Sequence, residues 1–208
     1  MRIVVTIKQV PDSNEVRLDP RTGTLIREGV PSIINPEDKN ALEAALAMRE
    51  AQGGEVIVLS MGPPQADDAL REALAMGVDR AILLTDRAFA GADTWATATT
   101  LGLGIRKLGG FDVILSGRQA IDGDTAQVGP QLAEYLGIPQ ITYVRSYQMS
   151  GGRVCATRTL EDGHEVLEVD LPVLMTITKE ANKPRYPTAP GIYRAYRQGT
   201  VERWGCAD

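Results

Sequence analysis

The chain alternates short apolar runs with stretches in which apolar residues recur at helical spacing. Such runs are typical of buried parallel strands, and helical spacing indicates helices that pack one face on a sheet. Four strands are predicted in the first part of the chain, at residues 2–7, 55–60, 79–84 and 111–116. Each is followed along the chain by a predicted helix, so we expect a parallel sheet with helices on both faces.

The predicted helices have clear start signals. Residues 35–38 read Asn-Pro-Glu-Asp, which combines a capping residue, a proline at the first helical position and acidic residues at the positive end of the helix. A second helix is predicted through residues 69–76 after a Met-Gly-Pro-Pro turn at 61–64, and a third runs from Asp93 or Thr94 to about Leu108. The inward positions predicted for the first helix are Ala41, Leu42, Ala45, Leu46 and Met48.

The pattern changes after residue 139. Residues 141–148, 154–160 and 165–169 alternate apolar and polar positions around glycine-containing turns, which predicts an antiparallel ribbon appended to the parallel core. Residues 171–178 are apolar enough to form another core strand. The next segment contains three prolines, which we expect to preclude an ordinary helix before Gly191. Residues 11–29 lack periodicity, and their turn signals predict a small hairpin or an ordered excursion.

Composition excludes several classes of protein. The 208 residues carry a formal net charge of −5 with both signs interleaved, which does not suggest a nucleic-acid-binding surface. No apolar run approaches the roughly 20 residues of a membrane span, and no signal-peptide pattern is present, so the expected compartment is the cytoplasm. Cys155 and Cys206 are expected to be free thiols. The single histidine, His164, is expected in a hairpin turn, and it excludes a His-pair metal site.

The most informative stretch is residues 117–130, Gly-Arg-Gln-Ala-Ile-Asp-Gly-Asp-Thr-Ala-Gln-Val-Gly-Pro. It lies between a predicted strand and a predicted helix, where α/β proteins bind ligands. We expect Thr125 or Asp124 to cap this helix and leave first-turn N–H groups for a phosphate. The stretch matches neither the Walker pattern nor G-x-G-x-x-G, so a plain surface loop is the alternative. Asp122 and Asp124 are interpreted as turn residues rather than as an acid–base pair.

Three glycine-bearing loops follow three of the predicted strands, at residues 61–64, 90–94 and 117–129. Because parallel strands end at one edge of a sheet, we expect these loops to form a binding cleft for a nucleotide-like ligand. The sequence offers no convincing Ser/His/Asp, Cys/His or metal-ligand arrangement beside them. Any reaction would then belong to the ligand, as in a cofactor protein.

Several of these residues resemble a known family. Residues 1–11, 35–36, 61–64, 117–127 and 182–186 are similar to the β subunit of electron transfer flavoprotein, and the resemblance covers essentially the whole chain in the right order. It implies a Rossmann-type, adenine-nucleotide α-hydrolase-like three-layer sandwich with a parallel sheet. It also implies a heterodimer with an α subunit that carries the electron-transferring FAD. The β subunit binds AMP in ordinary members of the family and a second FAD in electron-bifurcating members.

The resemblance implies a set of nucleotide-binding residues at strand ends and helix starts. It also places Pro36 and Glu37, at the start of the first helix, in the site. The residues expected to bind the cofactor are Thr6, Lys8, Asn35, Asp38, Met61, Gly62, Phe89, Gly91, Asp93, Thr94, Thr97, Gly117, Gln119, Ala120, Gly123, Asp124, Thr125, Ala126, Gln127 and Val128.

Two positions in this set favour FAD over AMP. Ordinary family members have Asn and Thr, which contact the AMP phosphate, at the positions of Ala126 and Val128. Their small apolar replacements, together with the longer loop at residues 86–94, resemble the bifurcating group. Phe89 in that loop can pack on a planar ring. The implied activity is hydride transfer from NADH to a β-subunit FAD, with one electron passing to the α-subunit FAD and one to a low-potential acceptor. An AMP-binding structural β subunit is the alternative.

Residues 179–196 resemble the recognition loop with which the family docks on dehydrogenases. The family's leucine anchor is Ala189 here, which weakens anchoring by on the order of 1–2 kcal/mol. The alternative is a simple connector. We therefore divide the chain into a nucleotide-binding domain, residues 1–178 with the ribbon at 141–170, and a segment, 179–208, that comprises this loop and the start of a C-terminal arm, either truncated or naturally short. Implied partners are the α subunit, an acyl-CoA or other dehydrogenase, and a quinone reductase or ferredoxin.

Two other classes of protein share the expected fold. A nucleotide-hydrolysing or adenylating enzyme would need a phosphate-gripping Ser-Gly-Gly loop after the first strand, but that sequence occurs at residues 150–152 in the ribbon. A non-redox nucleotide-sensing module that resembles a stress protein would not need residues 179–197. A visible absorption spectrum with flavin bands would exclude both.

Overall fold

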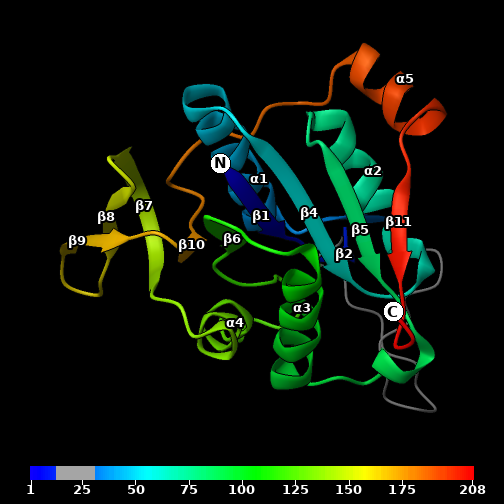
Figure 1. The fold of residues 1–208 in the computed structure, drawn as a ribbon, viewed down its shortest axis with the longest axis horizontal. Coiled ribbons are helices and arrows are strands. Elements are labelled where there is room, and N and C mark those ends of the chain that lie inside the picture. The colour runs from blue at the N-terminus through cyan, green and yellow to red at the C-terminus, as the bar shows by residue number, and fades with distance from the viewer. Residues whose placement is uncertain (13–30) are drawn as a thin grey trace.

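The computed structural model describes residues 1–12 and 31–208. In this part of the chain a nine-stranded sheet has the order β11-β5-β4-β1-β6-β10-β7-β8-β9 (Figure 1). The four predicted parallel strands form its centre, with β1 next to β4 and β6. Their bounds are β1 Arg2–Thr6, β4 Glu55–Met61, β5 Arg80–Leu84 and β6 Val113–Gly117. The hairpin predicted at residues 11–29 lies almost wholly outside the described residues.

Four helices cover the two faces of this parallel core, as predicted. Alternate strand residues point to opposite faces: Val5 and Val58 lie in the cluster with α1 and α2, whereas Val4 and Ile57 lie in the cluster with α3 and α4. The fold is therefore the expected three-layer α/β sandwich. The helices are α1 Pro36–Gln52, α2 Asp67–Met76, α3 Thr94–Leu108 and α4 Val128–Leu136, and the inward positions predicted for α1 are all buried.

The predicted ribbon is present and continues the main sheet. Strands β7 (Gln140–Ser150), β8 (Arg153–Thr159) and β9 (His164–Asp170) pair antiparallel, and His164 opens β9 beside the turn. The predicted core strand is β10 (Val173–Ile177), which pairs in parallel with β6 on one side and with β7 on the other. A short separate pair, β2 (Gln9–Pro11) and β3 (Ser32–Ile34), precedes α1.

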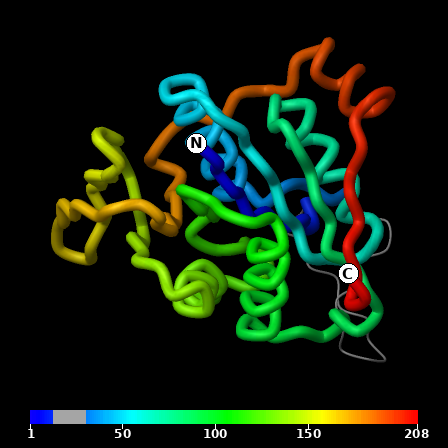
Figure 2. Tube along the Cα trace, in the orientation of Figure 1, coloured from blue at the N-terminus to red at the C-terminus, as the bar shows by residue number. Residues whose placement is uncertain are grey.

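The chain then crosses to the opposite edge of the sheet (Figure 2). Helix α5 (Ala189–Arg197) begins two residues before Gly191, so the prediction of no helix before that glycine is wrong. Pro190 is tolerated because first-turn N–H groups have no intrahelical partner, and Thr188 caps the helix by accepting from the N–H of Gly191 at 3.1 Å. Strand β11 (Val201–Trp204), which we did not predict, then pairs in parallel with β5.

Polar contacts hold the crossing segment on α1. Asn40 and Asn182 exchange hydrogen bonds between side chain and backbone, at 2.9 and 3.0 Å. The guanidinium of Arg185 binds Glu43 with two nitrogens, at 2.8 and 2.9 Å, and also contacts Glu50. Residues 182–185 are therefore fixed to the helix that begins beside the candidate site.

Candidate nucleotide-binding site

Asn35 connects the start of α1 to the 117–130 loop. It occupies the N-cap position, but its side chain does not cap the helix in the described structure, so that prediction is wrong. Its amide nitrogen donates to the backbone oxygen of Gln119 at 2.8 Å, and its amide oxygen accepts from the N–H of Ile121 at 3.1 Å. The side chain therefore fixes the loop at two successive points.

Asp38 joins the carboxyl ends of two neighbouring strands. Its carboxylate accepts from the N–H of Lys8, just beyond β1, at 2.8 Å and from the N–H of Gly117, at the end of β6, at 3.0 Å. The side chain is buried, and burial raises its pKa to about 7, outweighing the opposing effect of these hydrogen bonds and of Asn35. Glu37 adds a contact by accepting from the N–H of Gln119 at 3.2 Å.

Ionic and amide contacts shape the rest of the loop. The ammonium of Lys8 lies 2.7 Å from the carboxylate of Asp122, and the amide of Gln119 donates to Asp124 at 2.8 Å. Asp124 and Ala126 both have left-handed backbone conformations, with φ of 51° and 52°. Both aspartates thus make contacts that stabilise a turn, consistent with the turn interpretation.

Helix α4 begins later than predicted. Its N-cap position is held by Gln127, and within the described residues no side chain caps it, so capping by Thr125 or Asp124 is wrong. The physical reason is the left-handed pair at Asp124 and Ala126, which turns the chain again before the helix starts. The first-turn N–H groups of α4 are therefore left to other partners.

The loop at residues 86–94 reaches the site through its last two residues, Asp93 and Thr94. Asp93 caps α3, accepting from the N–H of Ala96 at 2.8 Å, in agreement with one of the two predicted caps. The hydroxyl of Thr94 donates to the side-chain oxygen of Gln127 at 3.2 Å, which brings the starts of α3 and α4 together, and Thr97 binds the backbone of Asp93.

Earlier parts of the second loop are less closely associated with the site. Phe89, at the end of the short helix η2 (Arg87–Phe89), packs against the hydrophobic cluster under α3 and α4. Gly91 has a φ of 77° and faces open space in the described structure. At the end of β4, the N–H of Gly62 binds Leu84, and Met61 packs against the same cluster as Phe89. The structure brings Thr94 and Gln127 together, whereas in the described part of the chain no hydrogen bond joins Phe89 or Gly91 to residues 117–128.

Sequence reasoning missed a row of hydroxyls across the strand ends. Thr6, Ser116 and Thr176 are in register on β1, β6 and β10, and all three are buried. They lie on the face covered by α3 and α4, because they follow Val4, Ile114 and Leu174 at the two-residue period. Thr6 was expected in the site, but Ser116 and Thr176 were taken as parts of apolar strands. The only signal in the sequence was a hydroxyl-bearing residue, Ser116, directly before the 117–130 loop.

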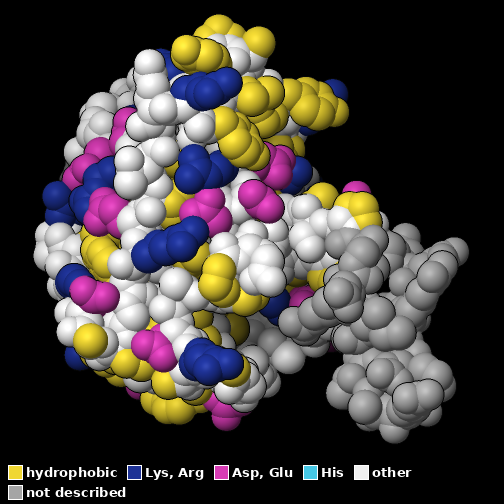
Figure 3. Space-filling view, turned by 90° about the vertical axis from the view of Figure 1, so that its right-hand side faces the viewer, with side chains coloured by type: hydrophobic (Ala, Val, Ile, Leu, Met, Phe, Trp, Pro, Cys, Tyr) yellow, Lys and Arg dark blue, Asp and Glu magenta, His cyan; other side chains and the backbone are white. Residues whose placement is uncertain are grey.

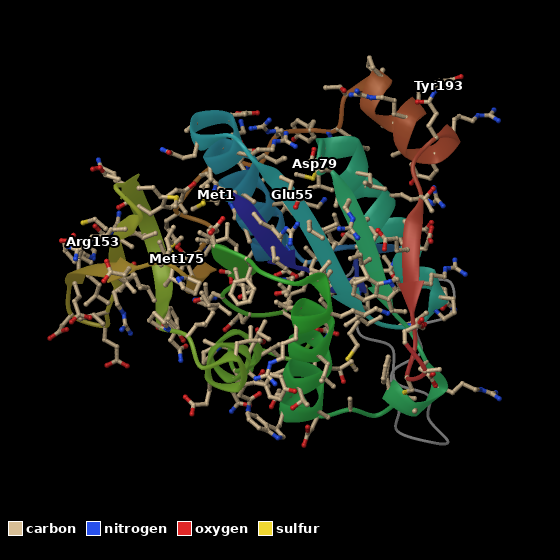
Figure 4. All side chains as sticks on the ribbon, in the orientation of Figure 1. Met1, Glu55, Asp79, Arg153, Met175 and Tyr193 are labelled. Carbon is tan, nitrogen blue, oxygen red and sulfur yellow. The ribbon has the colours of Figure 1, made fainter. Side chains whose placement is uncertain are left out.

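Two cavities in the described part of the chain lie away from this site. Two shallow cavities of about 430 and 250 Å³ lie at the opposite, amino ends of the strands, next to Met1, Arg2 and Asp112 (Figure 4 labels Met1 and Glu55 there). Neither is lined by a predicted cofactor residue. Among the described residues no cluster of His, Cys, Asp and Glu can hold a metal ion, and no helix is long and apolar enough to span a bilayer. Both cysteines are free, as predicted, and the structure shows that both are exposed.

Comparison with known proteins gives consistent matches over most of the chain. Residues 22–208 match the family described as "Electron transfer flavoprotein domain". The chain is 63% identical over 202 residues to the electron transfer flavoprotein subunit beta of Thermoanaerobacterium thermosaccharolyticum, covering 97% of this chain and 77% of the relative. It is 60% identical over 199 residues to the caffeyl-CoA reductase-Etf complex subunit CarD of Acetobacterium woodii, covering 95% and 76%. It is 50% identical over 200 residues to the acryloyl-CoA reductase electron transfer subunit gamma of Anaerotignum propionicum, covering 94% and 74%.

Proposed function

The chain belongs to the electron transfer flavoprotein family as a β subunit, and we propose that the site at the carboxyl edge of its sheet binds FAD. A role in electron transfer and pairing with an α subunit follow from the family. We infer further that the chain takes part in electron bifurcation with NADH as the donor. Relatives named as subunits of caffeyl-CoA and acryloyl-CoA reductase systems support an assignment to that group.

The observation that carries this proposal is the composition of the fixed loop. Asn35 and Asp38 hold residues 117–121 at the strand ends, while Ala126 and Val128 offer no polar side chain for a terminal phosphate. What remains are backbone N–H groups at the start of α4, hydroxyls on the strands and the ammonium of Lys8. Such groups fit the extended ribityl and pyrophosphate parts of a dinucleotide.

The protein's own contribution is to bind and orient. When bound, FAD would supply the redox chemistry, namely acceptance of a hydride from NADH and separate release of the two electrons to the α-subunit FAD and to a low-potential acceptor. Asp38 keeps the ends of β1 and β6 together and Asn35 holds the 117–130 loop, so both would help to hold a bound cofactor. We expect hydride transfer itself to need no side-chain acid or base.

Counting cofactors tests the proposal. We expect two FAD in each purified αβ pair, and we expect NADH to bleach the flavin absorption bands. The measurement is denaturation of the complex, followed by chromatographic quantification of FAD and AMP against protein concentration. One FAD with one AMP per pair would overturn FAD binding by this chain and leave the alternative of an AMP-binding β subunit. Absence of any nucleotide from the β subunit would overturn the nucleotide site itself.

An exposed apolar surface on α5 supports a partner-binding role for the crossing segment. Ile192, Tyr193 and Tyr196 are 46%, 62% and 54% exposed, and Figure 3 shows hydrophobic side chains gathered at this end of the molecule. We propose that α5 and residues 179–188 dock a dehydrogenase, and that other surfaces of the chain bind the α subunit. Exposed apolar area of this kind is typical of interaction sites.

Co-expression tests the α-subunit partnership. The chain produced together with its α subunit should elute from size-exclusion chromatography as a one-to-one complex, because the β subunit completes the electron-transfer unit. The chain produced alone is the control, and its elution volume should differ from that of the one-to-one complex. Elution of the two subunits as separate monomers would contradict the partnership.

A further inference from the structure

Ser116 is a buried hydroxyl at the edge of the candidate site. Its residue is 6% exposed, and its oxygen has no hydrogen-bond partner among the described residues. A buried hydroxyl without a partner destabilises a fold relative to alanine, which would fill the same strand position. The neighbours of Ser116 along β6 are apolar or glycine, so packing alone does not account for a serine there.

The hydroxyl of Ser116 is directed at the first turn of α4. A Cβ placed on Gly129, the second residue of that helix, would lie 2.9 Å from the serine oxygen and 2.7 Å from a methyl of Thr176. Because position 129 is a glycine, the backbone of α4 can approach Ser116 closely. The first-turn N–H groups lack intrahelical acceptors, and in the described residues no side chain caps the helix. A hydroxyl donor and the positive end of a helix thus lie together.

We propose that Ser116 is a ligand-binding residue whose hydroxyl donates to a phosphate oxygen that also binds the N–H groups of α4. This inference rests on the proposed nucleotide site and adds to it a residue that approaches the phosphate from beneath the helix. The phosphate belongs to a pyrophosphate diester or to a nucleoside monophosphate, and both present the same oxygen chemistry. Binding draws the first turn of α4 and the loop before it into contact with the ligand, which gives the hydroxyl its partner.

Ser60 supplies a matched control. It is fully buried, lies near the carboxyl end of β4, which β1 separates from β6, and has no partner for its hydroxyl among the described residues. Its side chain faces the α1 and α2 side, since it follows Val56 and Val58 at the two-residue period. Ser60 and Ser116 therefore share burial and chemistry but lie on opposite faces of the sheet.

The test compares Ser116→Ala with Ser60→Ala in the full chain purified with its α subunit. After removal of nucleotide from the β subunit, rebinding of FAD and of AMP is measured by isothermal titration, and thermal unfolding is followed without ligand. We expect Ser116→Ala to bind the preferred nucleotide about tenfold more weakly and Ser60→Ala to bind it as the wild type does. Both variants should unfold at or slightly above the wild-type temperature, because each loses an unpaired buried hydroxyl.

The outcomes distinguish a failure of the role proposed for Ser116 from a failure of the proposed nucleotide site. Wild-type rebinding with a selective loss in Ser116→Ala supports the inference, and the nucleotide that shows the loss identifies a pyrophosphate or a monophosphate. Equal affinities of the two variants overturn the role of Ser116 while the proposed site stands. Failure of the wild-type complex to rebind either nucleotide overturns the proposed site, and the role of Ser116 with it.

Discussion

Replacement of Gly117 by alanine is expected to lower the free energy of unfolding by about 3 kcal/mol and to abolish nucleotide retention. A Cβ at this position would lie 2.3 Å from the carboxylate of Asp38, 2.7 Å from the Asp38 backbone nitrogen and 2.8 Å from the Glu37 carbonyl carbon. Two of these atoms are backbone at the start of α1, so a side-chain rotation cannot relieve the overlap. Either β6 or α1 must move, and the hydrogen bond from Gly117 to Asp38 is lost.

Gly123→Ala provides the control in the same loop. A Cβ on Gly123 meets no described atom within 4 Å, and its φ does not require glycine. Its free energy of unfolding should stay within about 0.5 kcal/mol of wild type. Urea denaturation of the wild type and both variants measures the difference, and nucleotide content after purification measures retention. Equal stability of the two alanine variants would show that the close approach of α1 to β6 does not constrain this glycine.

Asp38→Asn is expected to cost about 2–3 kcal/mol of folding free energy, because only one of the two backbone hydrogen bonds that the Asp38 carboxyl accepts can be kept and the other buried N–H loses its partner. The asparagine oxygen can accept from one of Lys8 and Gly117, but its NH₂ group then faces the other backbone N–H. Nucleotide affinity should fall with it, since the ends of β1 and β6 are no longer joined. Asp68→Asn, at an exposed first-turn position of α2, is the matched control and should change stability by less than about 1 kcal/mol.

Wild type and Asp38→Asn are expected to differ in how their free energy of unfolding depends on pH. Burial raises the pKa of Asp38 from an ordinary 3.8 to about 7, so the folded chain keeps a proton that the unfolded chain releases between these values. The resulting stabilisation is fully present below the unfolded pKa and is lost as the pH rises through the folded pKa. The stability of wild type relative to Asp38→Asn should therefore fall across this range, by at most about 1.4 kcal/mol per pH unit. Urea denaturation at several pH values tests this, and parallel profiles would contradict it.

Local sequence patterns were sufficient to predict the strands and helices of the parallel core. The apolar runs and helical periods predicted the four central strands and the helices between them, because each element buries a face that its own sequence marks. Strand β11 escaped notice, since it has only four residues and two of them are the charged Glu202 and Arg203. Its pairing with β5 depends on a segment that crosses the whole sheet, and no local pattern records that.

The site was predicted as a region, but its contacts were not. Strand ends and helix starts predicted a site at the carboxyl edge of the sheet, which stays a prediction, whereas the role of Asn35 was misassigned because its local sequence is that of a cap. Its actual partners, Gln119 and Ile121, are 84 and 86 positions away in the chain. Ser116 was overlooked for a related reason: a serine at the end of an apolar strand acquires meaning only when α4 is placed above it.

The order in which the ribosome delivers the strands differs from their order in the sheet. Strand β10 must enter between β6 and β7 after the ribbon has been made, and β11 reaches the outer edge of β5 only after α5 has crossed the molecule. Until then β5 has an unpaired edge, which is a template for pairing with a neighbouring chain, and such long-range pairings form slowly. We therefore expect chains that are still being synthesised to aggregate most readily before residues 201–204 have emerged, and a holdase chaperone to be needed longest at that stage.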